Sequence, residues 1–400
     1  MDLICSHEIC TGCQACRLAC PKQCISMQED ERGNIYPIID QSLCIDCKKC
    51  QKVCPEIIPP SFSDGHPKVY AGWAKENQAR IRSTSGAISY VLSKHFLSSG
   101  DAFCGVVWSE YGAKHIVTTD ISEIERFQGS KYSHSDVGDC YKQIQALLKD
   151  GKRVLFTGTP CQCAALRNYL GKDYEGLFIV DLVCHGVPSR RVLREHIQRL
   201  EDENGKKIME MRFREKTPSQ INTSTKYTFD DGSFLLRSVH KDFFSRSFVD
   251  NYVLREGCFH CAFSRMERVS DITIADFWGY SPRRFKFRDY EKGVSIILVN
   301  NKKGEELFSM IKDSLLFEER DVKENCNQNL HAPQDKPADY EEYWKNYLEG
   351  ASHDVFWQKY FSPREPYKKS FATTRREYMT FFIPKWLFTF ARNIKHLIKK

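Results

Sequence analysis

Two copies of one cysteine motif stand 34 residues apart near the start of the chain, CTGCQACRLACP at residues 10–21 and CIDCKKCQKVCP at residues 44–55. In each copy, four cysteines are separated by two, two and three residues, and a proline follows the last one. Four thiolates at this spacing can wrap an iron–sulfur cube, and the fourth cysteine of each run binds the cluster of the other run. The spacing therefore predicts two crossed ligand sets. The first is Cys10, Cys13, Cys16 and Cys54, and the second is Cys44, Cys47, Cys50 and Cys20.

A zinc site is the alternative for these cysteines, because CxxC pairs also hold structural zinc. Two complete motifs, each ending in proline, favour iron–sulfur clusters instead. This part of the sequence resembles a bacterial-type two-[4Fe–4S] ferredoxin domain, which we expect over residues 1–60. The resemblance implies electron transfer as the task of this domain.

The composition narrows the class of protein. Hydrophobic residues make up 41% and charged residues 28% of the 400, so the chain can bury a core and is not a disordered polymer. No apolar run approaches the roughly 18 residues that a membrane-spanning helix needs. The first residues, MDLICSHEIC, contain no secretory signal, so we expect a reducing cytoplasm. There, ten cysteines within the first 54 residues are better explained as metal ligands than as disulfides.

After a polar joint between Pro59 and Pro67, short apolar runs alternate with helical stretches. This alternation predicts an α/β domain with a mixed or parallel sheet, and the segment around Asp231 and Gly232 predicts a hairpin turn. Strands are expected at 69–74, 102–108, 153–157, 176–183, 206–213, 225–229, 234–237, 271–275 and 294–300. Helices are expected at 86–97, 137–148, 161–170, 190–200, 340–348 and 354–361.

A second set of cysteines lies in this α/β region, at Cys161, Cys184, Cys258 and Cys261. Two of them follow predicted strands, where α/β sheets gather their functional loops. Four thiols from three loops are enough for a further cluster. Small buried hydrophobic residues and a zinc site are the alternatives that the spacing leaves open.

Five segments resemble the β-subunit family of coenzyme F420-reducing hydrogenases and dehydrogenases. They are RSTSGAISYVL (82–92), GSKYSHSD (129–136), TGTPCQCAALRNYL (157–170), LVCHGVPS (182–189) and CFHCAFSRMERVSDITIADFWGY (258–280). Members of this family are flavoproteins that bind FAD and carry iron–sulfur clusters. The resemblance implies a third [4Fe–4S] cluster on the second cysteine set, for which Cys163 could compete as a ligand.

The resemblance also sets the expected domain plan, which combines α+β and α/β structure. A bacterial-type 2[4Fe–4S] ferredoxin module precedes a central mixed α/β FAD-binding domain over residues 65–325. A helical tail follows over residues 326–400. No GxGxxG fingerprint opens a βαβ unit, so a classical Rossmann domain is not supported.

Candidate flavin-binding residues lie in the turns of these segments. Hydroxyls at 83–85 could cap the helix that follows and offer an anion site at its N-terminus, although an ordinary N-cap would look the same. Lys131 could contact phosphate or stabilise the reduced flavin, although a solvated loop lysine is the alternative. The expected cofactor-binding residues are Ser83, Thr84, Ser85, Gly86, Ser130, Lys131, Tyr132, Ser135, Gly158, Thr159 and Pro160.

The sequence leaves two possible roles open for each of three further residues. His185 follows a candidate cluster ligand and could relay a proton, although a structural hydrogen bond is the alternative. With Lys131, His185 completes the expected catalytic residues. Asp276 could hold a cofactor ribose or close a turn. Trp278 could stack near the flavin or lie in the core.

The C-terminal segment holds most of the excess positive charge. Residues 367–400 contain nine Lys/Arg and one acid, Glu377, against a net charge of +7 for the whole chain. The nearly neutral remainder does not suggest nucleic-acid binding. From Pro384 onward the pattern predicts a basic amphipathic helix. It could lie on the inner membrane face, although packing on the protein itself or on a partner is the alternative.

Together these features predict an iron–sulfur flavoprotein oxidoreductase that passes electrons between ferredoxin-type clusters and FAD. Hydride transfer with coenzyme F420 or another small organic substrate would be coupled to it, and ferredoxin or another redox donor or acceptor would be its partner. A fused ferredoxin with a basic tail resembles family members found beside surface-polysaccharide biosynthesis genes, which implies a sugar-related reductive step. The alternative is a non-catalytic electron-transfer subunit of a larger hydrogenase or dehydrogenase complex.

Overall fold

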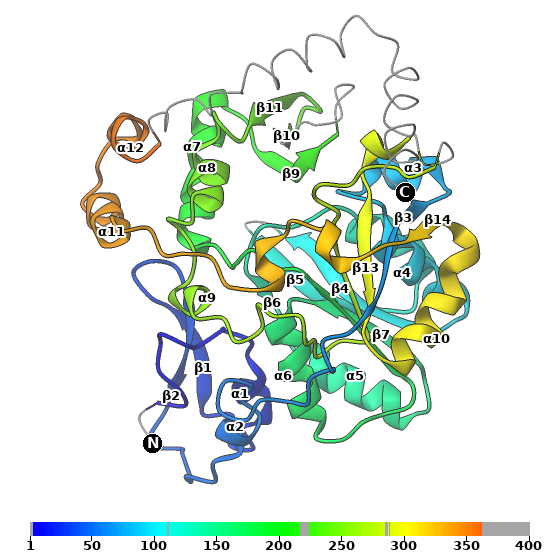
Figure 1. Ribbon diagram of the computed structural model, residues 1–400. Helices are drawn as coiled ribbons and strands as arrows, with labels where there is room; N and C mark the ends of the chain where they lie inside the picture. Colours follow the sequence, from blue (N-terminus) through cyan, green and yellow to red (C-terminus); the bar gives the residue numbers. More distant parts are fainter. Residues whose placement is uncertain (1–2, 110–111, 217–223, 285–286, 288, 362–400) are drawn as a thin grey trace, which may run out of the picture.

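The computed structural model describes residues 3–109, 112–216, 224–284, 287 and 289–361. Figure 1 shows three parts: a small N-terminal module, a large central sheet between helices, and a smaller sheet with its own helices. The basic segment at 367–400, with its predicted helix, lies outside the described residues.

The N-terminal module repeats one local structure in each cysteine motif. A short helix, α1 (Ala15–Ala19) or α2 (Lys49–Lys52), begins within each motif after a residue in the left-handed region. Strands β1 (Ile25–Glu29) and β2 (Ile35–Ile39) pair as an antiparallel hairpin between the two motifs. The sequence repeat is therefore also a structural repeat.

The central sheet has nine strands in the order β14-β3-β13-β12-β8-β7-β4-β5-β6. Its middle is parallel, from β4 through β7 and β8 to β12, whereas β3, β13 and β14 pair antiparallel on one side and β5 on the other. The strands are β3 (Lys68–Ala74), β4 (Ala102–Ser109), β5 (Gly112–Thr118), β6 (Ser135–Asp136), β7 (Val154–Gly158), β8 (Leu177–Leu182), β12 (Ile272–Asp276), β13 (Ser295–Val299) and β14 (Leu315–Glu319). The predicted mixed sheet is confirmed.

Helices cover both faces of this sheet. Along β7, Val154 and Phe156 pack toward α5 and α6, whereas Leu155 packs toward α4 and α10. Alternation of this kind follows from the two-residue period of a strand, and it explains why the central strands are apolar throughout. The helices are α4 (Ile88–Ser98), α5 (Cys140–Lys149), α6 (Pro160–Leu170) and α10 (Lys302–Ile311).

A second, aromatic core lies between the smaller sheet and its helices. Strands β9 (Ile208–Glu215), β10 (Ser224–Phe229) and β11 (Phe234–Ser238) form an antiparallel sheet in the order β11-β10-β9. Tyr227, Phe244 and Trp344 are among the residues buried here. The surrounding helices are α7 (Arg190–Asn204), α8 (Phe243–Val249), α11 (Tyr340–Leu348) and α12 (His353–Lys359).

The nine predicted strands and six predicted helices all occur, with shifts of a few residues at their ends. The sequence did not predict β5, β6, β14 and α10, which are short or combine apolar with charged residues. Short helices complete the described structure: α3 (Asn77–Arg82), α9 (Glu256–Phe259) and the 3₁₀ segments Ile121–Phe127, Tyr290–Lys292, Lys312–Ser314, Val322–Glu324 and Gln328–Leu330. Among the described residues, no helix has the length and apolar character needed to cross a membrane.

Candidate metal centres and cofactor site

The thiols predicted for the first cluster lie close together where the two motifs meet. All four, Cys10, Cys13, Cys16 and Cys54, are buried. Burial raises the pKa of Cys16 well above its usual value, and the other three thiols of the set raise it further. That mutual effect requires proximity, because Coulomb interactions weaken with distance. The fold therefore brings Cys54 of the second motif to the first three cysteines of the first motif.

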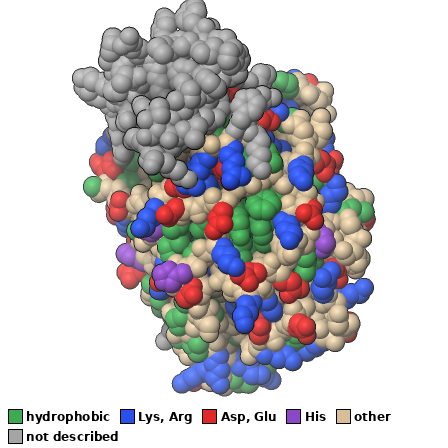
Figure 2. All heavy atoms as spheres, turned by 45° about the vertical axis from the view of Figure 1, so that its right-hand side comes forward, with side chains coloured by type: hydrophobic (Ala, Val, Ile, Leu, Met, Phe, Trp, Pro, Cys, Tyr) green, Lys and Arg blue, Asp and Glu red, His purple; other side chains and the backbone are tan. Residues whose placement is uncertain are grey.

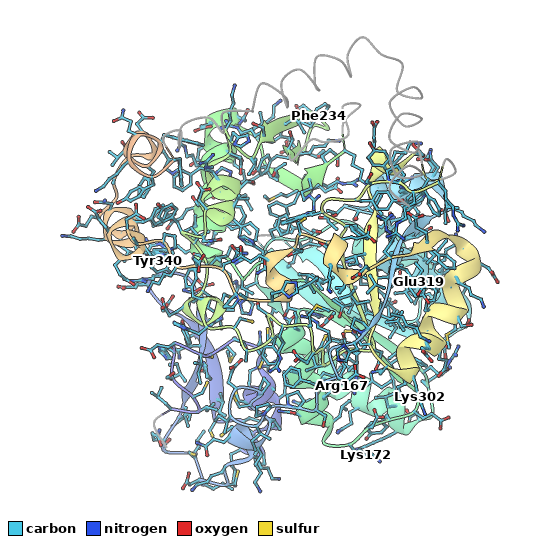
Figure 3. All side chains as sticks on the ribbon, viewed as in Figure 1. Arg167, Lys172, Phe234, Lys302, Glu319 and Tyr340 are labelled. Carbon is cyan, nitrogen blue, oxygen red and sulfur yellow. The ribbon has the colours of Figure 1, made fainter. Side chains whose placement is uncertain are left out.

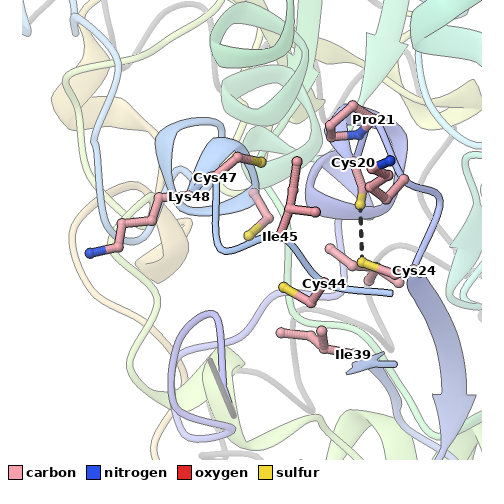
Figure 4. A pocket seen from close by; sticks show the side chains of 11 residues that line it. Cys20, Pro21, Cys24, Ile39, Cys44, Ile45, Cys47 and Lys48 are labelled. Carbon is pink, nitrogen blue, oxygen red and sulfur yellow. Dashed lines mark hydrogen bonds between the residues drawn. The ribbon is translucent and has the colours of Figure 1, made fainter. Parts of the chain in front are cut away.

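The thiols predicted for the second cluster line a cavity at the outer end of the module (Figure 4). The cavity encloses about 340 Å³ when the space at its open mouth is included, and every lining residue belongs to the N-terminal module. Cys20 of the first motif faces this cavity with three cysteines of the second, which is the crossed arrangement that the spacing predicts. The four predicted ligands here are Cys20, Cys44, Cys47 and Cys50.

Each of these sets has a fifth thiol beside it that was not assigned from the sequence. The Cys24 Sγ lies 3.3 Å from the Cys20 Sγ and also lines the cavity (Figure 4). Hydrogen bonds to Cys10 and Cys54 raise the pKa of Cys5 far above its usual value. The motif spacing does not include either position, so only the fold places them.

The third set is assembled at the carboxyl ends of β7 and β8. Cys161 lies in the first turn of α6 directly after β7, Cys184 follows β8, and Cys258 lies in α9 close to Cys261. Burial raises the pKa of Cys161 well above its usual value, and the other three thiols raise it further. The pKa of Cys184 and that of Cys258 rise to about 12, mainly through burial. All four predicted members therefore converge.

Cys163 does not join this set. Its Sγ lies 3.8 Å from the Gly158 carbonyl oxygen and 3.9 Å from that of Val180, and its side chain is completely buried in the core. On a helix, residues two positions apart point to different faces. Cys163 is therefore a core residue and not the competing ligand that its position in the sequence suggested.

The spread of the thiols bears on the zinc alternative. Among the described residues, no three His, Cys, Asp or Glu side chains converge as they would around a single metal ion. A zinc ion draws its sulfur ligands to about 2.3 Å from one centre. A cubane holds its thiolates around a larger body, so the thiols of a cluster site need not meet at one point.

The first and third sets lie next to each other. Burial chiefly raises the pKa of Cys13, and the Cys161 thiolate adds to that effect. Glu56 lies between the two sets. Its negative charge raises the pKa of Cys258 in the third set, and the charge of Cys54 in the first set raises the pKa of Glu56. Burial raises the pKa of Glu56 to about 7. The three sets thus follow one another from the outer end of the module to the edge of the central sheet.

The predicted flavin-binding turn at 83–86 does not cap the helix that follows. Helix α4 begins after Ala87, which has a left-handed φ of 66°, and no side chain caps it. The Ser85 hydroxyl donates instead to the Val294 carbonyl at 2.8 Å. At Gly86 a Cβ atom would lie 2.4 Å from the Gly72 carbonyl oxygen, so close packing on β3 requires glycine here. The predicted N-terminal capping was wrong.

The turn at 83–86 lies in contact with the other predicted flavin-binding segment, residues 130–132. The Ser130 N–H donates to the Thr84 Oγ1 at 2.8 Å. Beside it, the Lys131 Nζ donates to the backbone carbonyls of Arg126 and Gln128 at 3.1 and 3.0 Å. Burial lowers the pKa of Lys131 to about 7, and Arg212 lowers it further. Tyr132 packs nearby on Phe213 and Phe248.

A basic strand end beside this turn was not predicted from the sequence. Alternate residues of RFREK (212–216) are basic, and β9 directs them toward the turn. The Arg212 Nη2 donates to the Arg82 carbonyl, and the Lys216 Nζ donates to the carbonyls of Arg80 and Ser85. Arg214, with a left-handed φ of 55°, pairs with Asp276. Burial lowers the pKa of Lys216 to about 7, with Arg80 as the next cause.

The remaining predicted residues lie beside the third thiol set or in the core. The Ser135 Oγ accepts from the Gln162 Nε2 at 2.9 Å. Directly before Cys161 come Gly158, Thr159 and Pro160, and the Thr159 Oγ1 lies 3.2 Å from the Cys161 Sγ.

His185 is hydrogen-bonded through its Nε2 with the Phe248 carbonyl at 3.2 Å, and burial lowers its pKa. Trp278 is 50% exposed, which excludes the core as its location and leaves the other alternative, stacking near the flavin, untested.

Two families of known proteins match parts of the chain. Residues 151–325 match the family described as the C-terminal part of the coenzyme F420 hydrogenase/dehydrogenase beta subunit, and residues 9–58 match the 4Fe-4S dicluster domain. No curated protein sequence matches the chain. A chain of the F420-reducing [NiFe] hydrogenase complex from Methanosarcina barkeri is similar at 18% identity and a TM-score of 0.43, covering 67% of this chain and 87% of that one. Residues 151–325 therefore carry the C-terminal domain of the coenzyme F420 hydrogenase/dehydrogenase β subunit, and a 4Fe-4S dicluster domain precedes it in the chain.

Proposed function

We propose that this protein is an iron–sulfur flavoprotein oxidoreductase that exchanges electrons between an external one-electron carrier and a small organic substrate such as coenzyme F420. The observation that carries this proposal is the series of three thiol sets, from the open cavity at Cys20 to the sheet edge at Cys161. The family match over residues 151–325 supports the same class of reaction.

The residues of each set fit a [4Fe–4S] cluster in number, type and burial. We propose the first and second sets as the two ferredoxin clusters and Cys161, Cys184, Cys258 and Cys261 as the ligands of a third. The clusters would supply one-electron steps, and a flavin would couple them to hydride transfer. Burial keeps most of these thiols protonated in the apoprotein, so loading with iron must release protons.

The basic turn fits an anionic cofactor such as FAD. Five cationic side chains lie in the turn at residues 80–86, at residue 131 or at the end of β9. The two lysines among them have lowered pKa values, and a phosphate beside them would restore their full positive charge. The hydroxyls of Ser83 and Thr84 and the backbone of Ser130 add polar groups at the same place. The five cations are Arg80, Lys131, Arg212, Arg214 and Lys216.

We further propose that an acidic carrier protein docks over the second cluster. Exposed apolar side chains lie around the cavity at Ile38, Leu43 and Ile45. Figure 2 shows basic side chains gathered at the lower end of the molecule, where α2 and the preceding loop lie in Figure 1. An apolar centre with a charged rim is typical of transient electron-transfer interfaces. The exposed lysines of this module, none of them ion-paired with a described residue, are Lys22, Lys48, Lys49 and Lys52.

The proposal is tested by anaerobic purification, metal and sulfide analysis, and flavin extraction. Three cubanes predict about twelve iron atoms per chain. Changing Cys258 and Cys261 together to serine should lower that number to about eight, whereas the core variant Cys163→Ser should keep it. Zinc in place of iron, or iron unaffected by the double change, would overturn the cluster assignment.

The isolated chain should also reduce F420 or a nicotinamide with electrons from a reduced acidic ferredoxin. The chain could carry clusters and flavin and yet reduce no acceptor unless other subunits are present. That result would favour the alternative hypothesis, a non-catalytic electron-transfer subunit of a larger complex.

A further inference from the structure

Arg255 is a completely buried cation at the junction between the N-terminal module and the central domain. Its Nε donates to the Cys10 carbonyl at 2.7 Å, and its Nη2 donates to the Ile35 carbonyl. The guanidinium also lies 4.4 Å from the centre of the Tyr36 ring. These contacts satisfy part of its hydrogen-bonding capacity, but carbonyls and an aromatic ring do not neutralise its charge.

The other buried arginines show what this environment lacks. Arg80 pairs with Asp289, Arg268 with Asp181, and Arg320 with two glutamates. Within the described part of the chain, Arg255 forms no ion pair, and its Nη1 is buried without a hydrogen-bond partner. Burying an unpaired cation is strongly unfavourable. No described carboxylate neutralises Arg255, so its charge calls for the thiolates beside it and for the anionic group that they would hold.

The position of the unpartnered nitrogen indicates where that charge lies. Gly12, between two cysteines of the first set, has a φ of 66°, and a Cβ there would lie 2.3 Å from the Arg255 Nη1. On the other side, Arg255 precedes Cys258 of the third set by three residues. The glycine thus leaves room for the guanidinium beside the first set, while the chain itself places it beside the third.

Backbone contacts agree with this placement. The Arg255 Nε donates to the carbonyl of Cys10 in the first set, and the N–H of Cys258 in the third set donates to the Arg255 carbonyl at 2.9 Å. One cation therefore lies beside both ligand sets.

We propose that Arg255 is the shared counter-ion of the first and third iron–sulfur clusters and holds the reduction potential of both above the value they would have without it. The proposal rests on the cluster assignment made above. A cubane held by four thiolates is anionic and becomes more so on reduction, so a fixed cation favours the reduced form. Because the site is dry, this effect is weakly screened by salt. Arg255 acts as a positioning residue, since it carries no electron itself.

The alternative role is a mechanical one, because Arg255 also ties two carbonyls of the module to the central domain. Lysine separates the two roles, since it keeps the charge but cannot reproduce the planar fork. Glutamine keeps some hydrogen bonding and removes the charge. The second cluster, whose ligands lie in the outer cavity, provides an internal control in every variant.

The test compares the wild type with Arg255→Gln, Arg255→Lys and the exposed control Arg199→Gln on α7, using potentiometric titration followed by electron paramagnetic resonance. We expect Arg255→Gln to shift the first and third clusters to lower potential and to leave the second cluster in place. Arg255→Lys and the control should keep all three potentials near those of the wild type. Unshifted potentials in a fully loaded Arg255→Gln protein would overturn the proposal, as would equal shifts in the glutamine and lysine variants.

If Arg255→Gln fails to assemble, the lysine variant decides. Wild-type potentials in Arg255→Lys support the counter-ion, and lowered potentials refute it. A wild-type chain without the first or third cluster would instead refute the proposed function, so the two failures are distinguishable.

Discussion

Reversing charge at the outer end of the module should slow electron entry. The four exposed lysines of the module and the two aspartates near them in the sequence, Asp40 and Asp46, give a formal charge of +2. Changing Lys48 and Lys49 to glutamate makes it −2. Electrostatic steering changes association rates by about 10- to 1,000-fold. We expect the association rate constant with an acidic ferredoxin to fall about tenfold to hundredfold at low ionic strength.

Stopped-flow reduction of the loaded protein by an acidic bacterial ferredoxin measures this rate constant directly. The difference between variant and wild type should nearly vanish in about 0.5 M salt, where the screening length is only a few ångströms. Lys172→Glu with Lys302→Glu is the matched control, because Figure 3 places both exposed lysines away from the module. Equal slowing by the control pair, or a loss that salt does not remove, would refute docking at this face.

Three further outcomes follow from the described contacts. Changing Cys20 and Cys24 together to alanine should lower the iron content by about four atoms and spare the first cluster, since both thiols face the outer cavity; loss of all iron would contradict separate sets. Burial lowers the pKa of Lys131 to about 7, so FAD binding should weaken as pH rises through that value and the ammonium loses its proton. In Lys131→Met, equilibrium titration of FAD should give a flatter pH profile, and an unchanged profile would remove Lys131 from the site. Gly86→Ala should destabilise the fold by about 3 kcal/mol, because its Cβ would lie 2.4 Å from a backbone oxygen of β3. Thermal unfolding checks this against Gly112→Ala, whose Cβ would have an ordinary contact at 3.4 Å.

The sequence predicted most of the fold because its strongest signals are local. Cysteine spacing and the apolar runs of the central strands are short-range patterns, and the elements that they predicted are present. The strands β14, at one edge of the sheet, and β5, next to the other edge, were missed for a physical reason. β14 reads LLFEE and β5 reads GAKHIVT, so each combines a few apolar residues with charged ones. Their pairing depends on neighbours far away in the chain, which no local window contains.

The candidate sites divide in the same way. Crossed ligation at Cys20 and Cys54 follows from a repeated motif, whereas the extra thiol at Cys24 is beside the cavity only because of how the loop closes. The basic end of β9 is visible in the sequence as basic residues at alternate positions of RFREK. A search for a two-residue period of charge in the predicted strand could have identified it. No pattern in the sequence indicates a role for Arg255. Its proposed role depends on its contacts with Cys10 and Ile35, which lie more than 200 residues earlier in the chain.

Contacts around Arg255 join the N-terminal module to the central domain. The proposed electron transfer between the first and third sets requires a short separation, which a flexible tether would not maintain. The Gln14 Nε2 donates to the Asp136 Oδ1 at 2.9 Å, and the Arg17 Nη2 donates to the Gly138 carbonyl at 2.5 Å. The apolar side chains of α1 pack into the same core as α5 and α6. Since the module shares that core, loosening it would separate the sets and expose apolar surface at once, so the electron path and the stability of the fold depend on the same contacts.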